Sequence, residues 1–199
     1  MSWTTFLYLG NLTLTLPLAC AIAAWLLAAR HWRAAGYWLL FFASALATVG
    51  ISKLAYLGWG TTIPALNFQA LSGHATGVTA VFPVLLYLLL QRLPKQAFAA
   101  AAAGLLLGAG LAVGLVATGE HTVAEAGAGW IVGAAAAAGT IRIAGQAQPP
   151  RPLAGMAAGL LAFATTAWVM QRAHVGYWMI KLALALSGNT HPFQWGCCN

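Results

Sequence analysis

The sequence contains no aspartate, and its only carboxylate side chains are Glu120 and Glu125. Charged residues make up 6% of the 199 residues, hydrophobic residues make up 61%, and the mean hydropathy is +0.81. This shortage of charge excludes an ordinary soluble domain, in which about a quarter of the residues are charged. No long polar stretch separates the apolar runs, so a separate soluble domain is not expected either. We predict a single membrane domain over residues 1–199.

Six apolar runs can cross a hydrocarbon core of about 30 Å as helices, which takes about 20 residues each. The predicted spans are residues 6–29, 37–57, 75–90, 97–117, 123–141 and 153–170. The first run lacks the basic segment and cleavage site of a signal peptide, so we expect it to be a span. A seventh run, 175–186, is shorter and contains Lys181, and we expect it to be interfacial or re-entrant. The predicted fold class is therefore an all-α bundle of six transmembrane helices with a short C-terminal segment.

Basic residues are spread singly over the loops, and the lack of a basic patch argues against nucleic-acid binding. Six of the nine lysines and arginines fall on one predicted side of the membrane: Arg30, Arg33, Arg92, Lys95, Arg142 and Arg151. By the positive-inside tendency this side is cytoplasmic. We therefore expect a multi-pass protein of a bacterial-type inner (plasma) membrane, with its N-terminus facing the periplasm.

Cysteine is scarce and glycine is abundant. Cys20 lies in the first predicted span, and Cys197 and Cys198 are neighbours near the C-terminal end, where an exported thiol could oxidise. We assign no function to these cysteines. Glycines four residues apart, as at 104/108 and 129/133, allow helix backbones to approach closely in lipid. Packing within the bundle is the favoured interpretation, and a homodimer or a protein partner stays open.

Polar residues return at the predicted outer ends of the helices. Ser72 is a candidate N-cap, which would leave the amides of Gly73, His74 and Ala75 free at a helix start, where the dipole favours an anion. A phosphate could bind there. Capping alone would also explain Ser72.

A second group of polar residues lies at the predicted outer end of the span 123–141. His121 and Glu125 are four residues apart and share a helix face, so the carboxylate can hold the imidazole in one tautomer. Lys53 lies near the same predicted side, where it could simply extend to the headgroups. Ionisable residues at membrane depth are costly, so their convergence on one side indicates a site.

The order of these residues resembles the type-2 phosphatidic acid phosphatase superfamily, which includes bacterial lipid phosphatases and soluble vanadium haloperoxidases. Lys53 matches the first part of the family signature, Ser72-Gly73-His74 matches most of the second, and His121 with Glu125 matches the end of the third. The resemblance covers residues 53–133 within a phosphatase-like core of residues 37–145. Residues 152–199 form a C-terminal extension.

The resemblance implies hydrolysis or transfer of phosphate from a lipid phosphate or polyprenyl diphosphate at the outer membrane face. His121 would attack phosphorus and form a phosphohistidine, Glu125 would orient it, and His74 would protonate the leaving oxygen and then activate water. The phosphoryl oxygens would be held by Lys53, Ser72 and Gly73. This chemistry needs no metal or cofactor.

The chain departs from the family signature where two arginines, two prolines and a serine are expected. Gly60-Thr61 stands in place of Arg-Pro, Leu71 in place of proline, and Gly114-Leu115 in place of Ser-Arg. The two arginines would grip phosphate oxygens. We hypothesise that Arg172 and Lys181 of the C-terminal extension supply replacement contacts, against the simpler interpretation that Arg172 ends a helix and Lys181 extends to the headgroups.

Two other functions stay open. The protein could keep the fold and bind a lipid head or a protein partner without turnover. Alternatively, His74 and His121 could be axial ligands of a b-type haem between helices, although this would leave Glu125 and the Ser-Gly-His turn unexplained.

Overall fold

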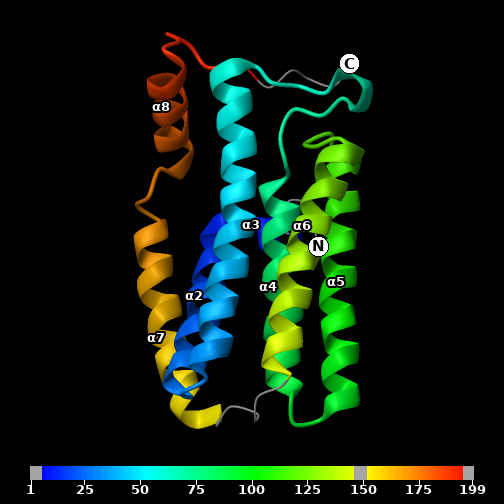
Figure 1. Ribbon diagram of the computed structural model, residues 1–199, viewed down its shortest axis with the longest axis vertical. Coiled ribbons are helices and arrows are strands. Elements are labelled where there is room, and N and C mark those ends of the chain that lie inside the picture. The colour runs from blue at the N-terminus through cyan, green and yellow to red at the C-terminus, as the bar shows by residue number, and fades with distance from the viewer. Residues whose placement is uncertain (1–5, 146–151, 195–199) are drawn as a thin grey trace.

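A computed structural model describes residues 6–145 and 152–194, which fold into a helical bundle (Figure 1). The α-helices are α2 Leu12–Ala28, α3 Trp32–Trp59, α4 Gly73–Leu90, α5 Pro94–Ala117, α6 Val123–Ala144, α7 Pro152–Met170 and α8 Val175–Ser187. Two 3-10 turns, η1 Tyr8–Gly10 and η2 Pro64–Leu66, precede α2 and α4. Among the described residues the only pairing of strand type is a single bridge between Ile63 and Phe68.

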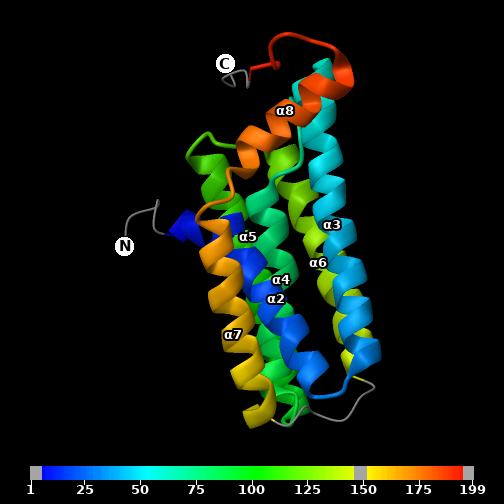
Figure 2. The same ribbon diagram turned by 90° about the vertical axis from the view of Figure 1, so that its left-hand side faces the viewer.

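Helix α4 is the centre of the bundle. It packs most extensively against α5 and α6, and it also contacts α2 and α3. Helix α7 lies along α2, and α3 contacts both α6 and α8, as two perpendicular views show (Figures 1 and 2). The central position of α4 explains why its side chains are the most buried of the long apolar helices.

Glycines on α5 and α6 allow both helices to approach α4 closely. A Cβ atom on Gly104 would lie 2.6 Å from Pro83 N, and one on Gly129 would lie 2.6 Å from Ser72 O. Both neighbours are backbone atoms of the α4 region, which cannot move aside cheaply. The prediction that these glycines serve packing within the bundle is therefore confirmed at these two positions.

The protein is an all-α membrane protein. Four helices, α3, α4, α5 and α6, are long and apolar enough to cross a membrane, whereas α2, the Gly155–Met170 part of α7, and α8 are shorter apolar segments. The predicted limits of the first span are wrong, because the chain turns at Gly10 and α2 begins only at Leu12. Asn11 caps α2 by accepting a hydrogen bond from Thr13 N at 3.0 Å.

Helix α8 and residues 188–194 pack along the C-terminal part of α3, beyond the end of α7 (Figure 1). Asn189 Nδ2 donates to Gly58 O at 2.6 Å, and Phe193 N donates to Leu57 O at 3.1 Å. These bonds attach the tail to the last turn of α3. Cys20 is a partly buried free thiol, and Cys197 and Cys198 lie outside the described residues.

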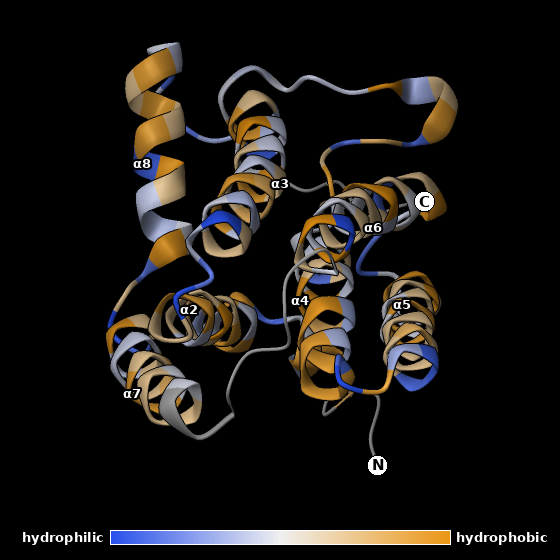
Figure 3. Ribbon diagram, turned by 60° about the horizontal axis from the view of Figure 1, so that its bottom comes forward, coloured by the Kyte–Doolittle hydropathy of each residue, from blue (hydrophilic) through white to orange (hydrophobic). Residues whose placement is uncertain are grey.

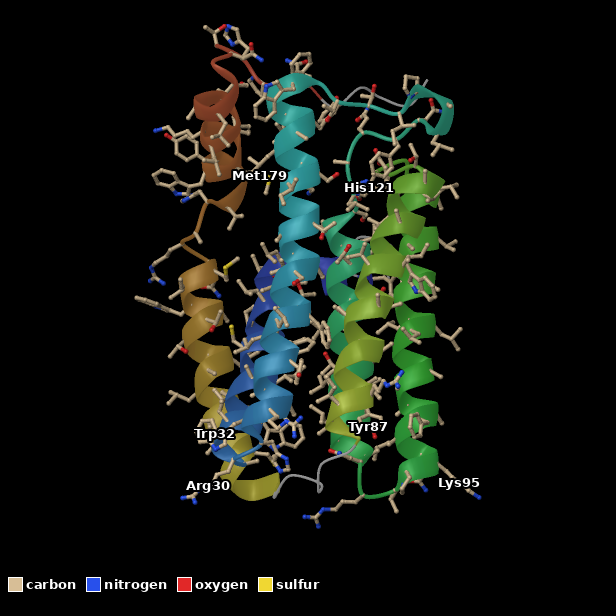
Figure 4. The ribbon with its side chains drawn as sticks, viewed as in Figure 1. Arg30, Trp32, Tyr87, Lys95, His121 and Met179 are labelled. Carbon is tan, nitrogen blue, oxygen red and sulfur yellow. The ribbon has the colours of Figure 1, made fainter. Side chains whose placement is uncertain are left out.

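Hydrophobic residues dominate the helices, with hydrophilic residues scattered among them (Figure 3). Arg30 and Lys95 lie at one end, and His121 lies toward the other (Figure 4). Five of the six residues used to predict the orientation flank the helix ends on the Arg30 side, and the sixth, Arg151, lies outside the described residues. We call the Arg30 side the basic end and the His121 side the histidine end.

Candidate functional site

His121 and Glu125 form a hydrogen-bonded pair at the start of α6. His121 Nδ1 lies 2.8 Å from Glu125 Oε2. The two side chains are 13% and 6% exposed, so the pair is largely shielded from solvent. The prediction that they share a helix face is confirmed. Because the carboxylate engages Nδ1, Nε2 is the ring nitrogen that is left to meet a ligand.

Glu125 also holds the loop that leads into α4. Its Oε1 accepts hydrogen bonds from Gln69 N at 2.8 Å and Ala70 N at 3.3 Å. Its Oε2 accepts one from Thr122 N at 3.2 Å, while Thr122 Oγ1 accepts one from Glu125 N, which completes a capping box. One buried carboxylate therefore fixes the histidine ring, the start of α6 and the loop before α4.

The start of α4 is built as the sequence predicts, with one correction. Ser72 is fully buried and caps the helix, because its Oγ accepts a hydrogen bond from Ala75 N at 3.3 Å. The Ala75 amide is therefore not free for an anion, contrary to the prediction. No described residue accepts a hydrogen bond from the amides of Gly73 or His74. These two amides remain as donors at the positive end of the helix.

Lys53 reaches this turn from α3. A Cβ atom on Gly73 would lie 3.9 Å from Lys53 Nζ, so the amine stands beside the start of α4. Lys53 interacts electrostatically with Glu125 and with His74, and His74 interacts with His121. The fold thus brings together the predicted lysine, both histidines and the glutamate from α3, α4 and α6.

Three supporting elements were not predicted. Ser52 Oγ accepts a hydrogen bond from Leu71 N at 3.0 Å and so links α3 to the loop before α4. The amides of Gln69 and Ala70 bind the Glu125 carboxylate. A Cβ atom on Gly10 would lie 2.8 Å from the Cβ atom of His74, so the N-terminal turn packs against this histidine. Ser52 is next to Lys53 in the sequence, but no local pattern links Gly10 to the site.

The residues that stand where the family signature has its two arginines have structural roles in this protein. Gly60 ends α3 in a left-handed conformation with φ of 63°, and the ring of Phe193 packs directly against it. Leu115 is fully buried, and its carbonyl oxygen accepts hydrogen bonds from the backbone amides of Glu120 and His121 at 3.0 and 3.2 Å. Leu115 therefore shapes the loop that presents the nucleophile candidate, without offering a cation.

Arg172 and Lys181 lie on exposed parts of the C-terminal extension. The Arg172 guanidinium is 4.0 Å from the centre of the Trp168 ring and donates to Trp168 O at 3.2 Å. Lys181 Nζ is 5.0 Å from the centre of the Tyr177 ring and 5.6 Å from that of Trp178. These described contacts are with aromatic neighbours in the same segment. Helix α8, which carries Lys181, lies on the far side of α3 from His121 (Figure 4).

Comparison with known proteins gives one relative. A protein of Klebsiella pneumoniae, described as an uncharacterized 22.5 kDa protein in cps region, is 33% identical over 140 residues, which cover 69% of this chain and 67% of that protein. The chain belongs to the family of that protein. No protein-family model matches the chain, and no solved structure matches it. The relative's description assigns no activity, so the chemistry has to be inferred from the site.

The site combines an oriented imidazole, a second imidazole, an amine and two helix-start amides. The amine and the amides can hold an anion, and the imidazole Nε2 can act as a nucleophile or exchange a proton. In the described part of the chain no three His, Cys, Asp or Glu side chains are grouped as metal ligands. The side chains present at the site are suited to group transfer on an anionic substrate.

Proposed function

We propose that the protein is a membrane phosphatase or phosphotransferase that acts through a phosphohistidine on His121. The observation that carries this proposal is the 2.8 Å contact between His121 Nδ1 and Glu125 Oε2 beside the start of α4. A carboxylate that fixes one ring nitrogen raises the basicity of the other and aims it. The resemblance to the type-2 phosphatidic acid phosphatase superfamily supports the same roles.

The proposed reaction has two displacements. In the first, His121 Nε2 forms a bond to phosphorus while the bond to the leaving oxygen breaks, and His74 gives that oxygen a proton. In the second, His74 takes a proton from water, the water oxygen bonds to phosphorus, and the bond to His121 breaks. Inorganic phosphate leaves, and both histidines return to their starting states. Transfer to an alcohol would replace water in the second step.

Phosphate binding is assigned to the groups around the α4 start. Lys53 supplies a positive charge beside Gly73, and the amides of Gly73 and His74 supply donors at a helix N-terminus. Ser72 contributes mainly by holding this turn in shape, because its hydroxyl is buried and engaged in capping. These donors stabilise the charge that develops on the phosphoryl oxygens.

The substrate class follows from the position of the site in a membrane protein. We propose six crossings, with α2 and α7 completing the four longer spans, and the histidine end facing the periplasm across an inner membrane. The basic loops at the opposite end support this orientation. A lipid phosphate or polyprenyl diphosphate could then keep its tail in the bilayer while its head reaches His121. The relative is described as a protein in cps region of the bacterium Klebsiella pneumoniae, which is compatible with a bacterial membrane.

Phosphate release tests this proposal. Purified wild-type protein in detergent should release phosphate from phosphatidic acid or a polyprenyl diphosphate. His121→Ala should lower the rate by at least about a thousandfold, because no other group replaces the nucleophile. His31→Ala is the matched control, since this histidine precedes α3 at the basic end. Equal rates in the wild type and His121→Ala would overturn the phosphohistidine mechanism.

A second candidate function is binding of a phosphorylated lipid head without turnover. The observation that favours it is the replacement of both expected arginines by Gly60 and the buried Leu115. Bidentate guanidinium contacts are not easily replaced by an amine and backbone amides. Saturable binding of phosphatidic acid that weakens in Lys53→Ala, with no phosphate release, would establish this function in place of catalysis.

A further inference from the structure

A groove opens on the side of the bundle between α5 and α6, near the basic end. Its volume is about 910 Å³, and Pro83 and Tyr87 of α4 contribute to its wall. Most of its lining is apolar, with alanines from α5 and α6. It shares no residue with the site around His121, so what binds there is independent of the proposed function.

The groove forms because α5 and α6 both pack against α4. Helices α5 and α6 each pack more extensively against α4 than against each other. Small side chains such as Ala101, Ala134 and Ala138 leave the space between them unfilled. Toward the histidine end, Trp130 Nε1 of α6 donates to Leu105 O of α5 at 3.1 Å, which bridges the two helices. The groove therefore extends from this bridge toward the basic end.

Two arginines stand at the basic end of the groove. Arg92 and Arg142 both line it and both are exposed. The only carboxylates in the sequence, Glu120 and Glu125, lie at the other end of α6. Glu125 is about 25 Å from Arg142 along the helix, at 1.5 Å per residue. The two guanidinium groups are therefore not neutralised by any side-chain carboxylate of this chain.

The walls beside the arginines are fixed. Gln91 Nε2 donates to Ala144 O at 2.8 Å and ties the end of α4 to the end of α6. The rings of Tyr87 and Phe98 meet edge to face with centres 5.4 Å apart, which ties α4 to α5. The mouth is thus formed by three connected helix ends, with a preformed shape that costs little ordering on binding.

We infer that this groove binds an anionic phospholipid of the leaflet next to the basic end, with its phosphate at Arg92 and Arg142 and an acyl chain between α5 and α6. Basic pockets between transmembrane helices recognise anionic lipid heads in this way. The volume lies within the range of about 300–1,000 Å³ that is typical of small-molecule sites. From Arg142 to Ala134 the groove follows about 12 Å of helix, which suits part of an acyl chain.

The inference can be tested with the full chain in lipid nanodiscs or detergent. Phosphatidylglycerol should bind more tightly than phosphatidylcholine, as measured by native mass spectrometry of lipid-bound protein. The double variant Arg92→Gln/Arg142→Gln should weaken phosphatidylglycerol binding about tenfold or more, on the scale of the attraction of single basic residues to anionic lipid. Arg30→Gln/Arg33→Gln removes two charges from the same end outside the groove and should change the affinity little.

A second pair of variants tests the apolar part. Ala138→Phe fills the groove while leaving both arginines, and Ala135→Phe adds the same bulk at an exposed position of α6 that does not line the groove. Only Ala138→Phe should reduce lipid binding. Equal affinity for the two lipids, or equal losses in the two arginine double variants, would overturn the inference. So would a dimer that Ala138→Phe dissociates while lipid binding is unchanged, since a second copy would then occupy the groove.

Discussion

The histidine end and the basic end of the bundle differ in how their charged groups are held. At the histidine end Glu125 is buried and joined to a histidine ring, to backbone amides and to a helix cap. At the basic end Arg92 and Arg142 are exposed, and no carboxylate lies near them. Buried charge is stable only with a full set of partners. The histidine end is therefore a rigid, preorganised site, whereas the basic end is suited to reversible binding from the membrane.

The largest expected effect on stability comes from removing the central carboxylate. Glu125→Ala leaves the amides of Gln69 and Ala70 without their acceptor and should lower the free energy of unfolding by about 3 kcal/mol. Denaturant unfolding of the detergent-solubilised protein measures this loss. Glu120→Ala, at the exposed neighbouring carboxylate, is the control and should stay within about 0.5 kcal/mol of the wild type. Similar losses in both variants would contradict the structural role assigned to the buried Glu125 carboxylate.

Helix packing at the site gives the next effect. Gly129→Ala places a Cβ atom 2.6 Å from Ser72 O and should cost about 1–3 kcal/mol, because the obstructing atom belongs to the backbone. Gly127→Ala on the same helix meets no atom within 4 Å and should instead stabilise by up to about 1 kcal/mol through helix propensity. Unfolding of the two variants side by side decides whether α6 is as close to α4 as described.

A smaller effect is expected at the cap of α6. Thr122→Ala removes the hydroxyl that accepts a hydrogen bond from the Glu125 amide, and it should lower the free energy of unfolding by about 1 kcal/mol. Thr122→Ser keeps the hydroxyl and should recover most of that loss. If the serine variant is as unstable as the alanine variant, the methyl group of Thr122 matters more than its cap.

The smallest effect is expected at the basic end. Arg142→Gln removes one exposed charge from the last turn of α6 and should change the unfolding free energy by less than about 1 kcal/mol, the range of a helix-dipole interaction. Its lipid affinity should change more than its stability. A large loss of stability in detergent without phospholipid would mean that Arg142 has a structural partner.

Much of the fold can be predicted from the sequence because the surrounding membrane interior is apolar. Long runs of Ala, Leu and Gly form helices in a membrane, so most helix limits lie close to the predicted ones, although α3 begins at Trp32 and not at residue 37. The pairing of His121 with Glu125 and the cap at Ser72 also follow from local spacing alone. The start of α2 was missed because hydropathy does not register the turn at Gly10.

The rest of the site depends on contacts between distant segments. Ser52 and the amides of Gln69 and Ala70 support the site only because α3, the loop before α4 and α6 converge. The groove between α5 and α6 results from unequal packing of two helices on a third, which composition does not reveal. Such features need the tertiary arrangement of the helices.

Direct detection of a phosphorylated histidine is the sharpest test of the proposed chemistry. Wild-type protein mixed with phosphatidic acid and quenched at high pH should carry phosphate on the peptide that contains His121, as mapped by mass spectrometry. His121→Ala should lack this phosphate, and His31→Ala should keep it. Phosphate release without any phosphate on His121, or no turnover and no phosphorylation in the wild type, would contradict a phosphohistidine mechanism.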